Sequence, residues 1–209
     1  MLKDIRNNYQ QNELLEKDVK ENPLEQFRIW LDESLRSKVN EPTAMVLSTV
    51  DGQNRPHARV VLLKEQNSQG FVFFTNYSSA KAGHIAINRF ASLTFFWPEL
   101  ERQVRIDGSI ERISGKLSDE YFASRPVDSR LGAWASPQSQ VISSKSVLDE
   151  SFSKYRKKFG DEIPRPQNWG GYLVIPYQIE FWQGRPNRLH DRICYQLEKN
   201  GWKIVRLAP

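Results

Sequence analysis

The sequence predicts a mainly β protein of the α+β class, built as an antiparallel β-barrel with accessory helices. Short runs of apolar, β-branched and aromatic residues recur between turn residues from the middle of the chain to its end. Helical patterns interrupt these runs irregularly, whereas a doubly wound α/β sheet requires strands and helices in alternation. With 209 residues, 39% of them hydrophobic, the chain suffices for one domain with a core, which excludes wholesale disorder.

The chain is expected to begin with a flexible arm and to continue as one domain. Residues 1–22 are polar and lack a sustained apolar period, so they are assigned to the arm, and 23–209 to the domain. The first helix is predicted over about 24–38, behind Pro23, which suits a first helical turn. Its apolar residues recur at spacings of three and four: Leu24, Phe27, Leu31 and Leu35.

Eight strands and three further helices follow in the prediction. The β-branched and aromatic runs place strands at 44–50, 59–63, 70–75, 92–97, 103–113, 171–182, 192–197 and 202–207. Turn residues typical of hairpins separate some of them, as in Asp51-Gly52 and Asn200-Gly201. Helices are expected at 78–87, from Ser118 until Pro126 ends the helix, and at 147–159.

Composition excludes several classes of protein. The single Cys194 permits no internal disulfide, and three histidines give no Cys/His spacing for zinc, so no metal is expected. The longest uncharged apolar stretch, 90–98, is too short to span a membrane, and the charged N-terminus argues for a cytoplasmic location. The net charge of +5 is scattered along the chain, which favours small anions over nucleic acid as ligands.

Common phosphate-binding and hydrolase motifs do not fit the sequence. Residues 108–116 lack the spacing and the Ser or Thr of a phosphate-binding loop. Gly170-Gly171 precedes a predicted strand, whereas a dinucleotide fingerprint follows one. The sequence also has no Gly-x-Ser-x-Gly elbow, so a Ser-His-Asp hydrolase is disfavoured.

Two cations, Arg59 and Lys64, bracket the second predicted strand. The run between them is too apolar for a surface segment. At least one of the two cations is therefore expected to meet a buried or half-buried anion, because an unpaired buried charge is costly. The alternative is that both are solvated cations at the rim of the strand.

A phenol, a guanidinium and a hydroxyl follow at spacings of four, in Tyr121, Arg125 and Ser129. On a helix this spacing places all three on one face. Together they suit a phosphate group, since an arginine binds two oxygens at once. Pro126 interrupts an ideal helix, and the alternative is a solvent-facing helix end with a structural tyrosine.

The segment 181–192 concentrates a tryptophan and several titratable side chains around one turn. In an extended conformation it sends Arg188, His190 and Arg192 to one side. Such a row repels itself unless an anion or an aromatic system lies against it. This segment is therefore interpreted as part of a functional site.

Together with other motifs, these segments occur in a fixed order along nearly the whole chain. They lie at 6–9, 59–64, 100–104, 124–129, 132–139, 181–184, 188–192 and 206–209. In this order they resemble the pyridoxine/pyridoxamine 5′-phosphate oxidase family. The resemblance implies an FMN-binding split β-barrel that forms a homodimer, with FMN at the subunit interface in clefts completed by both chains.

The resemblance also implies which residues bind FMN. One subunit would contribute Arg59, Val60, Val61, Leu62, Leu63, Lys64, Phe74, Thr75 and Lys81. The other subunit would contribute, across the interface, Gln103, Gln138, Ser139, Trp182 and Arg192. One departure concerns Ala80, because many members of the family carry arginine directly before the phosphate-binding lysine, and weaker retention of FMN is expected here.

The implied substrates are pyridoxine 5′-phosphate and pyridoxamine 5′-phosphate. Their phosphate would be bound by Lys64, Tyr121, Arg125 and Ser129, and a lid would form from Arg6 and Tyr9. Arg188 and His190 are the expected catalytic residues and would hold the pyridine ring against the flavin. The implied reaction is hydride transfer to flavin N5, giving pyridoxal 5′-phosphate. O2 would then reoxidise the flavin to yield hydrogen peroxide, and the amine substrate would also release ammonia.

Three alternatives remain open at this point. A split-barrel flavoprotein acting on another substrate would keep the FMN half of the pattern. A non-catalytic module that binds flavin or pyridoxal phosphate would keep the barrel without turnover. Nucleic-acid binding through the basic surface would show a steep salt dependence.

Overall fold

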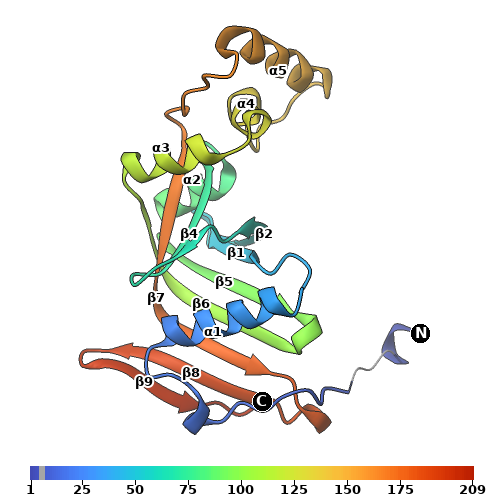
Figure 1. Cartoon of the computed structure of the whole chain (residues 1–209), viewed down its shortest axis with the longest axis vertical. Helices are drawn as coiled ribbons and strands as arrows, with labels where there is room; N and C mark the ends of the chain where they lie inside the picture. The colour runs from blue at the N-terminus through green and yellow to red at the C-terminus, as the bar shows by residue number, and fades with distance from the viewer. Residues whose placement is uncertain (5–7) are drawn as a thin grey trace.

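The structure, a computed structural model of the chain, describes residues 1–4 and 8–209 (Figure 1). Its helices are η1 (Leu2–Asp4), η2 (Glu16–Asp18), α1 (Pro23–Arg36), α2 (Ala80–Ile87), η3 (Pro98–Leu100), α3 (Gly115–Ser124), α4 (Val127–Ala135), α5 (Ser146–Phe159) and η4 (Pro186–Arg188). Its strands are β1 (Ala44–Val50), β2 (Pro56–Leu62), β3 (Glu65–Gln66), β4 (Phe71–Asn76), β5 (Phe90–Trp97), β6 (Arg102–Arg112), β7 (Trp169–Gln183), β8 (Asp191–Glu198) and β9 (Gly201–Arg206).

The predicted fold class is confirmed, and all eight predicted strands are present with small shifts at their ends. The short β3 and the helix α4 are additional. The prediction omits α4 because Pro126 was taken only as the end of a helix. In the structure Pro126 ends α3 and also occupies the N-cap position of α4, with extended backbone angles.

The strands form one antiparallel sheet in the order β2-β1-β5-β6-β7-β4-β3, extended by β8 and β9 beside β7. This order brings β2 and β4 close together. In the part of the chain that the structure describes, no hydrogen-bonded ladder joins these two strands. The barrel is therefore split along this line.

Helix α1 closes one side of the main core. The Asn22 side chain accepts a hydrogen bond from Leu24 N at 2.9 Å, and Pro23 occupies the first turn, so the helix begins at Pro23. Its Phe27 is fully buried, with ring centroids 4.8 Å from Phe71 and 5.0 Å from Phe95. Figure 1 shows α1 lying across β5 and β6.

A smaller core lies under α3, α4 and α5, which gather at one end of the molecule (Figure 1). It is built from Phe122, Leu131, Ile163 and Trp169. Because Trp169 begins the fifteen-residue strand β7, this core is tied directly to the sheet. The helices of this end are thus held in place beside the split between β2 and β4.

Residues 14–20, within the predicted arm, are packed against β8 and β9. Leu14 is buried, and its backbone N–H donates to Asp191 Oδ2 at 3.1 Å. Arg206 donates to the Leu14 carbonyl and pairs with both Asp191 and Glu16. These bonds anchor the segment, because they satisfy its backbone and neutralise its charges. The arm boundary at 22 and the role as a lid stay predictions.

Two further features of the described residues matter below. Cys194, on β8, is a free and buried cysteine, and burial raises the pKa of its thiol. Among the helices within 1–4 and 8–209, none combines the length and apolar character needed to cross a membrane.

Candidate active site

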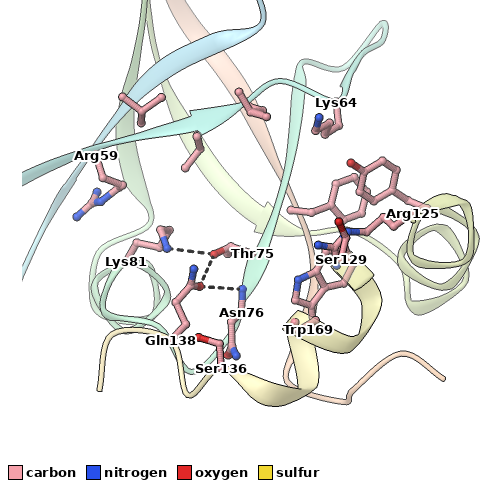
Figure 2. A pocket seen from close by; sticks show the side chains of 17 residues that line it. Arg59, Lys64, Thr75, Asn76, Lys81, Arg125, Ser129, Ser136, Gln138 and Trp169 are labelled. Carbon is pink, nitrogen blue, oxygen red and sulfur yellow. Dashed lines mark hydrogen bonds between the residues drawn. The ribbon is translucent and has the colours of Figure 1, made fainter. Parts of the chain in front are cut away.

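A cavity of about 630 Å³ lies at the split between β2 and β4 and reaches α3 and α4 (Figure 2). It brings together most of the residues predicted for one subunit's FMN and phosphate sites, together with Gln138, which the resemblance assigns to the other subunit. These are Arg59, Val60, Val61, Leu62, Lys64, Phe74, Thr75, Lys81, Tyr121, Arg125, Ser129 and Gln138. Leu63 is instead buried in the main core, because its side chain points to the opposite side of the strand from its neighbours.

One end of the cavity is formed around Lys81, in the first turn of α2. Lys81 is 8% exposed, and its ammonium donates to Thr75 Oγ1 at 3.1 Å and Ser79 Oγ at 3.4 Å. Burial, and next the charge of Arg59, lower the pKa of Lys81. An anion placed here would be favoured by both cations and by the N-terminus of α2.

Gln138 completes this end of the cavity. Its Oε1 accepts from the Thr75 hydroxyl at 3.2 Å and from Asn76 N at 3.4 Å. Gln138 therefore lies in the same chain's cavity as Thr75 and Lys81, whereas the resemblance implied that it reaches FMN from the other subunit. The neighbouring Ser139 does not line the cavity.

The other end of the cavity is formed around Arg125, between α3 and α4 (Figure 2). Its guanidinium lies 4.7 Å from the centre of the Trp169 ring, a cation–π contact. Its Nη1 is buried and has no hydrogen-bond partner among the described residues. Burial lowers the pKa of Arg125 and raises that of Tyr121. An unpaired buried donor of this kind suits an anionic ligand.

Tyr121, Arg125 and Ser129 do not lie on one continuous helix, because the helix ends before Pro126, as predicted, and Ser129 belongs to α4. The three side chains nevertheless line one cavity. Ser129 approaches the cavity from this second helix. The three side chains expected to bind phosphate are thus brought together by two helices and not by the face of one helix.

Aromatic rings line the cavity at its Arg125 end (Figure 2). The rings of Phe74 and Tyr121 are stacked with centroids 3.8 Å apart, and Trp169 lies nearly parallel to both. A Cβ atom on Gly171 would lie 2.9 Å from the Phe74 ring, so glycine is needed for this ring to rest against β7. The sequence analysis missed Trp169 as a site residue, and the signal was its place directly before Gly170-Gly171.

The donors and rings fit a phosphorylated aromatic group such as FMN. Within the described chain, the cavity lining contains no carboxylate but includes the four cations Arg59, Lys64, Lys81 and Arg125. Figure 2 shows Arg59 and Lys81 on one side and Lys64 and Arg125 on the other. Two separate cationic ends suit two phosphate groups, and the aromatic rings in the lining suit a planar molecule.

A second group of predicted residues lies apart from this cavity, on β6, β7 and β8. The sheet register places Gln103 opposite Trp182, and Trp182 opposite Arg192. The three side chains therefore share one face of the sheet. His190 and Tyr9 join this group, with ring centroids 4.6 Å and 5.7 Å from Trp182.

The segment 184–190 is not extended, so the predicted row of Arg188, His190 and Arg192 is wrong. Asn187 and Arg188 have positive φ angles of 59° and 64°, which turn the chain sharply. Arg192 pairs with the buried Glu180 at 2.8 Å. The anion expected beside Arg192 is therefore the carboxylate of Glu180, which lies on β7.

His190 is positioned by the same turn. Its Nδ1 accepts a hydrogen bond from Arg185 N at 3.1 Å, which places the proton of the neutral ring on Nε2. Burial, and next the charge of Arg188, lower the pKa of His190. The imidazole is therefore a neutral Nε2–H donor near pH 7. Arg6, the remaining predicted site residue, lies outside the described residues.

The outer face of the sheet beside Gln103 is apolar. Exposed side chains on it include Val46, Val60 and Phe96, the last of which lies opposite Gln103. Exposed apolar strips of this kind mark surfaces of association.

Two family descriptions match the chain. Residues 31–159 match the family described as pyridoxamine 5′-phosphate oxidase. Residues 169–209 match a second description, the pyridoxine 5′-phosphate oxidase C-terminal dimerisation region. The second match contains β7, β8 and β9, and with them Trp182 and Arg192.

Curated relatives are similar over the full length. A pyridoxine/pyridoxamine 5′-phosphate oxidase of Neisseria gonorrhoeae is 58% identical, covering 100% of this chain and 99% of the relative. The protein of the same name from Thermosynechococcus vestitus is 52% identical, covering 99% and 98% of the two chains.

Solved structures share the fold. PhzG of Burkholderia lata, in complex with tetrahydrophenazine-1-carboxylic acid, superposes with a TM-score of 0.89 at 27% identity, over 94% of this chain and 98% of that one. An FMN-binding protein of Nostoc punctiforme, related to pyridoxamine 5′-phosphate oxidase, has a TM-score of 0.73 at 20% identity, over 91% and 100% of the two chains.

Proposed function

The chain belongs to the pyridoxamine 5′-phosphate oxidase family, and from this membership we propose the reaction it catalyses. It is an FMN-dependent oxidase that converts pyridoxine 5′-phosphate or pyridoxamine 5′-phosphate to pyridoxal 5′-phosphate, with O2 as the electron acceptor. The single observation that carries the proposal is the cavity with two cationic ends and an aromatic wall, in a chain 58% identical to a curated oxidase of that name.

The cavity residues divide into two sets in this proposal. Arg59, Lys81, Thr75 and Gln138 bind the FMN phosphate, which would neutralise two neighbouring cations. Lys64, Tyr121, Arg125 and Ser129 bind the phosphate of the substrate, and the unpaired Nη1 of Arg125 supports this role. Bound FMN would accept a hydride from the substrate and pass the electrons to O2, yielding hydrogen peroxide.

The active form in this proposal is a homodimer with FMN at the interface. The C-terminal dimerisation region and the exposed apolar face support association. A two-fold dimer would bring Gln103, Trp182 and Arg192 of one subunit to the cavity of the other. The separation of the two residue groups within one chain supports this arrangement, because each group alone is incomplete.

Arg188 and His190 are the proposed catalytic residues. The neutral His190 would donate its Nε2 proton in a hydrogen bond to the substrate, which orients the reacting carbon without adding charge. Arg188, which is exposed at the turn, would cover the substrate ring. Lys64 and Arg125 stay protonated beside a phosphate, so they bind the substrate and do not act as bases. A cytoplasmic location stays a prediction that cell fractionation tests.

The proposal is tested by mixing the FMN-loaded protein with pyridoxine 5′-phosphate under anaerobic conditions and following the absorbance of oxidised flavin. The expected result is bleaching, then recovery on admission of air with formation of pyridoxal 5′-phosphate and hydrogen peroxide. Pyridoxamine 5′-phosphate is tested in parallel. If flavin binds but neither compound bleaches it, the protein is a flavin-binding module or acts on another substrate.

A further inference from the structure

Thr49 lies behind the cavity wall, where its hydroxyl meets Arg59. The side chain of Thr49 is 1% exposed and projects from β1. Arg59 Nη1 donates to Thr49 Oγ1 at 2.8 Å and to the Leu47 carbonyl at 2.9 Å. Both protons of that nitrogen are therefore engaged by β1, the strand paired with β2.

The remaining donors of Arg59 are left for a ligand. An arginine has five N–H groups, and Nη1 carries two of them. Within the described chain, Nε and Nη2 of Arg59 have no hydrogen-bond partner, while the residue lines the cavity together with Lys81. Anchoring one nitrogen fixes the plane of the guanidinium and thereby aims the other two.

His84 of α2 orients the Thr49 hydroxyl. The two side chains are joined by a hydrogen bond of 3.1 Å between Thr49 Oγ1 and His84 Nδ1. Because Arg59 can only donate, Thr49 accepts from it with a lone pair, and its own proton is free for His84. This arrangement requires a neutral His84 with the lone pair on Nδ1.

The surroundings keep His84 neutral. Its pKa is lowered by burial first and then by the charges of His57 and Arg59 on β2 and of Arg55 in the turn between β1 and β2, while Asp51 opposes them. The rings of His57 and His84 lie 4.5 Å apart. The carboxylate of Asp51 binds His57 Nε2 at 3.0 Å. A His84 ring that took up a second proton would therefore face the neighbouring His57 imidazole and the Arg59 guanidinium.

We propose that Thr49 is a positioning residue for phosphate binding: its buried hydroxyl, oriented by His84, holds the Arg59 guanidinium at the cavity wall. The inference rests on the proposed FMN site. Positioning matters here because α2 begins with Ala80 and supplies no guanidinium of its own at this end. A guanidinium already held in place loses little conformational freedom when the phosphate binds.

The test compares FMN with riboflavin, which lacks the phosphate, by titrating the apoprotein and following quenching of flavin fluorescence. The substitution Thr49→Val keeps the shape of the side chain and removes the hydroxyl. It is expected to raise the Kd for FMN about 3- to 10-fold and to leave the Kd for riboflavin unchanged. Thr49→Ser keeps the hydroxyl and is expected to bind FMN like the wild type.

A double-mutant cycle shows whether Thr49 acts through Arg59. In an Arg59→Ala background, Thr49→Val is expected to cause no further loss of FMN affinity. His84→Ala supplies a second variant on α2, should Thr49→Val not fold, and is expected to weaken FMN binding without affecting riboflavin.

Two results would overturn the inference. One is an unchanged Kd for FMN in Thr49→Val, or in His84→Ala if Thr49→Val does not fold. The other is equal weakening of FMN and riboflavin, which indicates a structural role only. If the wild-type protein binds no FMN, the proposed function itself fails, and this outcome is distinct from both.

Discussion

Ala80 is the residue at which the resemblance implies a departure, since many members of the family are expected to carry arginine there. It opens α2, is exposed, and immediately precedes the buried Lys81. Ala80→Arg is expected to lower the Kd for FMN at least about tenfold, because a charge-assisted hydrogen bond contributes about 1.5–3 kcal/mol. Fluorescence titration measures it. Ala80→Gln, which supplies a shorter, uncharged hydrogen-bond donor, is the control, and an equal gain in both variants would contradict the charge argument.

Arg125 is expected to act in binding and not in turnover. Arg125→Ala should raise the KM for pyridoxine 5′-phosphate about 10- to 100-fold, with kcat and the FMN Kd nearly unchanged, because its unpaired guanidinium nitrogen is the phosphate donor. Steady-state kinetics measure the effect. Arg125→Lys, which keeps the charge but not the flat contact with Trp169, should have a KM between those of the wild type and Arg125→Ala. Loss of turnover at saturating substrate with unchanged KM would refute the assignment.

At the scale of elements, the turn between β7 and β8 joins the N-terminal segment to the second residue group. A Cβ atom on Gly184 would lie 2.6 Å from the Tyr9 ring, which contacts Trp182 and His190. Gly184→Ala should therefore displace Tyr9 and raise the KM for pyridoxine 5′-phosphate several-fold, with FMN affinity unchanged.

Gly83→Ala on α2 serves as the matched control for this substitution, because a Cβ there meets no atom within 4 Å. Its KM should equal that of the wild type. A Gly184→Ala protein with wild-type KM would show that Tyr9 does not act on the substrate from this position.

The elements also show what the sequence can and cannot predict. The strands are predictable because apolar and β-branched residues form a local pattern, as in β4 and β7. The turn at Asn187 and Arg188 is not, since positive φ at two successive non-glycine residues is uncommon and the local residue pattern does not indicate it. Pro126 is ambiguous for a similar reason, because a proline both ends one helix and precedes another. The cavity residues could still be predicted, because each was selected for the chemistry of its own side chain and not for an expected backbone conformation.

At the scale of the whole molecule, the proposed homodimer divides each active site between two chains. A mixed dimer of Arg125→Ala and His190→Ala subunits should then contain one intact site and one doubly altered site. Co-expressed in equal amounts and assayed at a substrate concentration far below the raised KM of Arg125→Ala, the two impaired variants should recover about a quarter of wild-type activity, since half of the dimers are mixed and half of their sites are intact. Activity of the purified mixture measures it.

The control for this experiment pairs Arg125→Ala with Ser129→Ala. Both residues line the same cavity of one chain, so no site in their mixed dimer is better than in the Ser129→Ala parent. Absence of recovery with His190→Ala would show that Arg125 and His190 act from the same subunit. In the proposed dimer, the half of the site on β6 to β8 is completed by the other chain, so the sequence alone locates its residues but not their partners.

The burial of Cys194 bears on how long the enzyme survives its own catalysis. An oxidase that releases hydrogen peroxide at each turnover exposes itself to an oxidant that attacks thiolates and accessible sulfur. Cys194 is 1% exposed, and its raised pKa keeps the thiol protonated. Met45 is equally buried, which leaves Met1 as the one exposed sulfur of the sequence. The fold thus protects the enzyme from oxidative self-inactivation by keeping its vulnerable atoms out of reach.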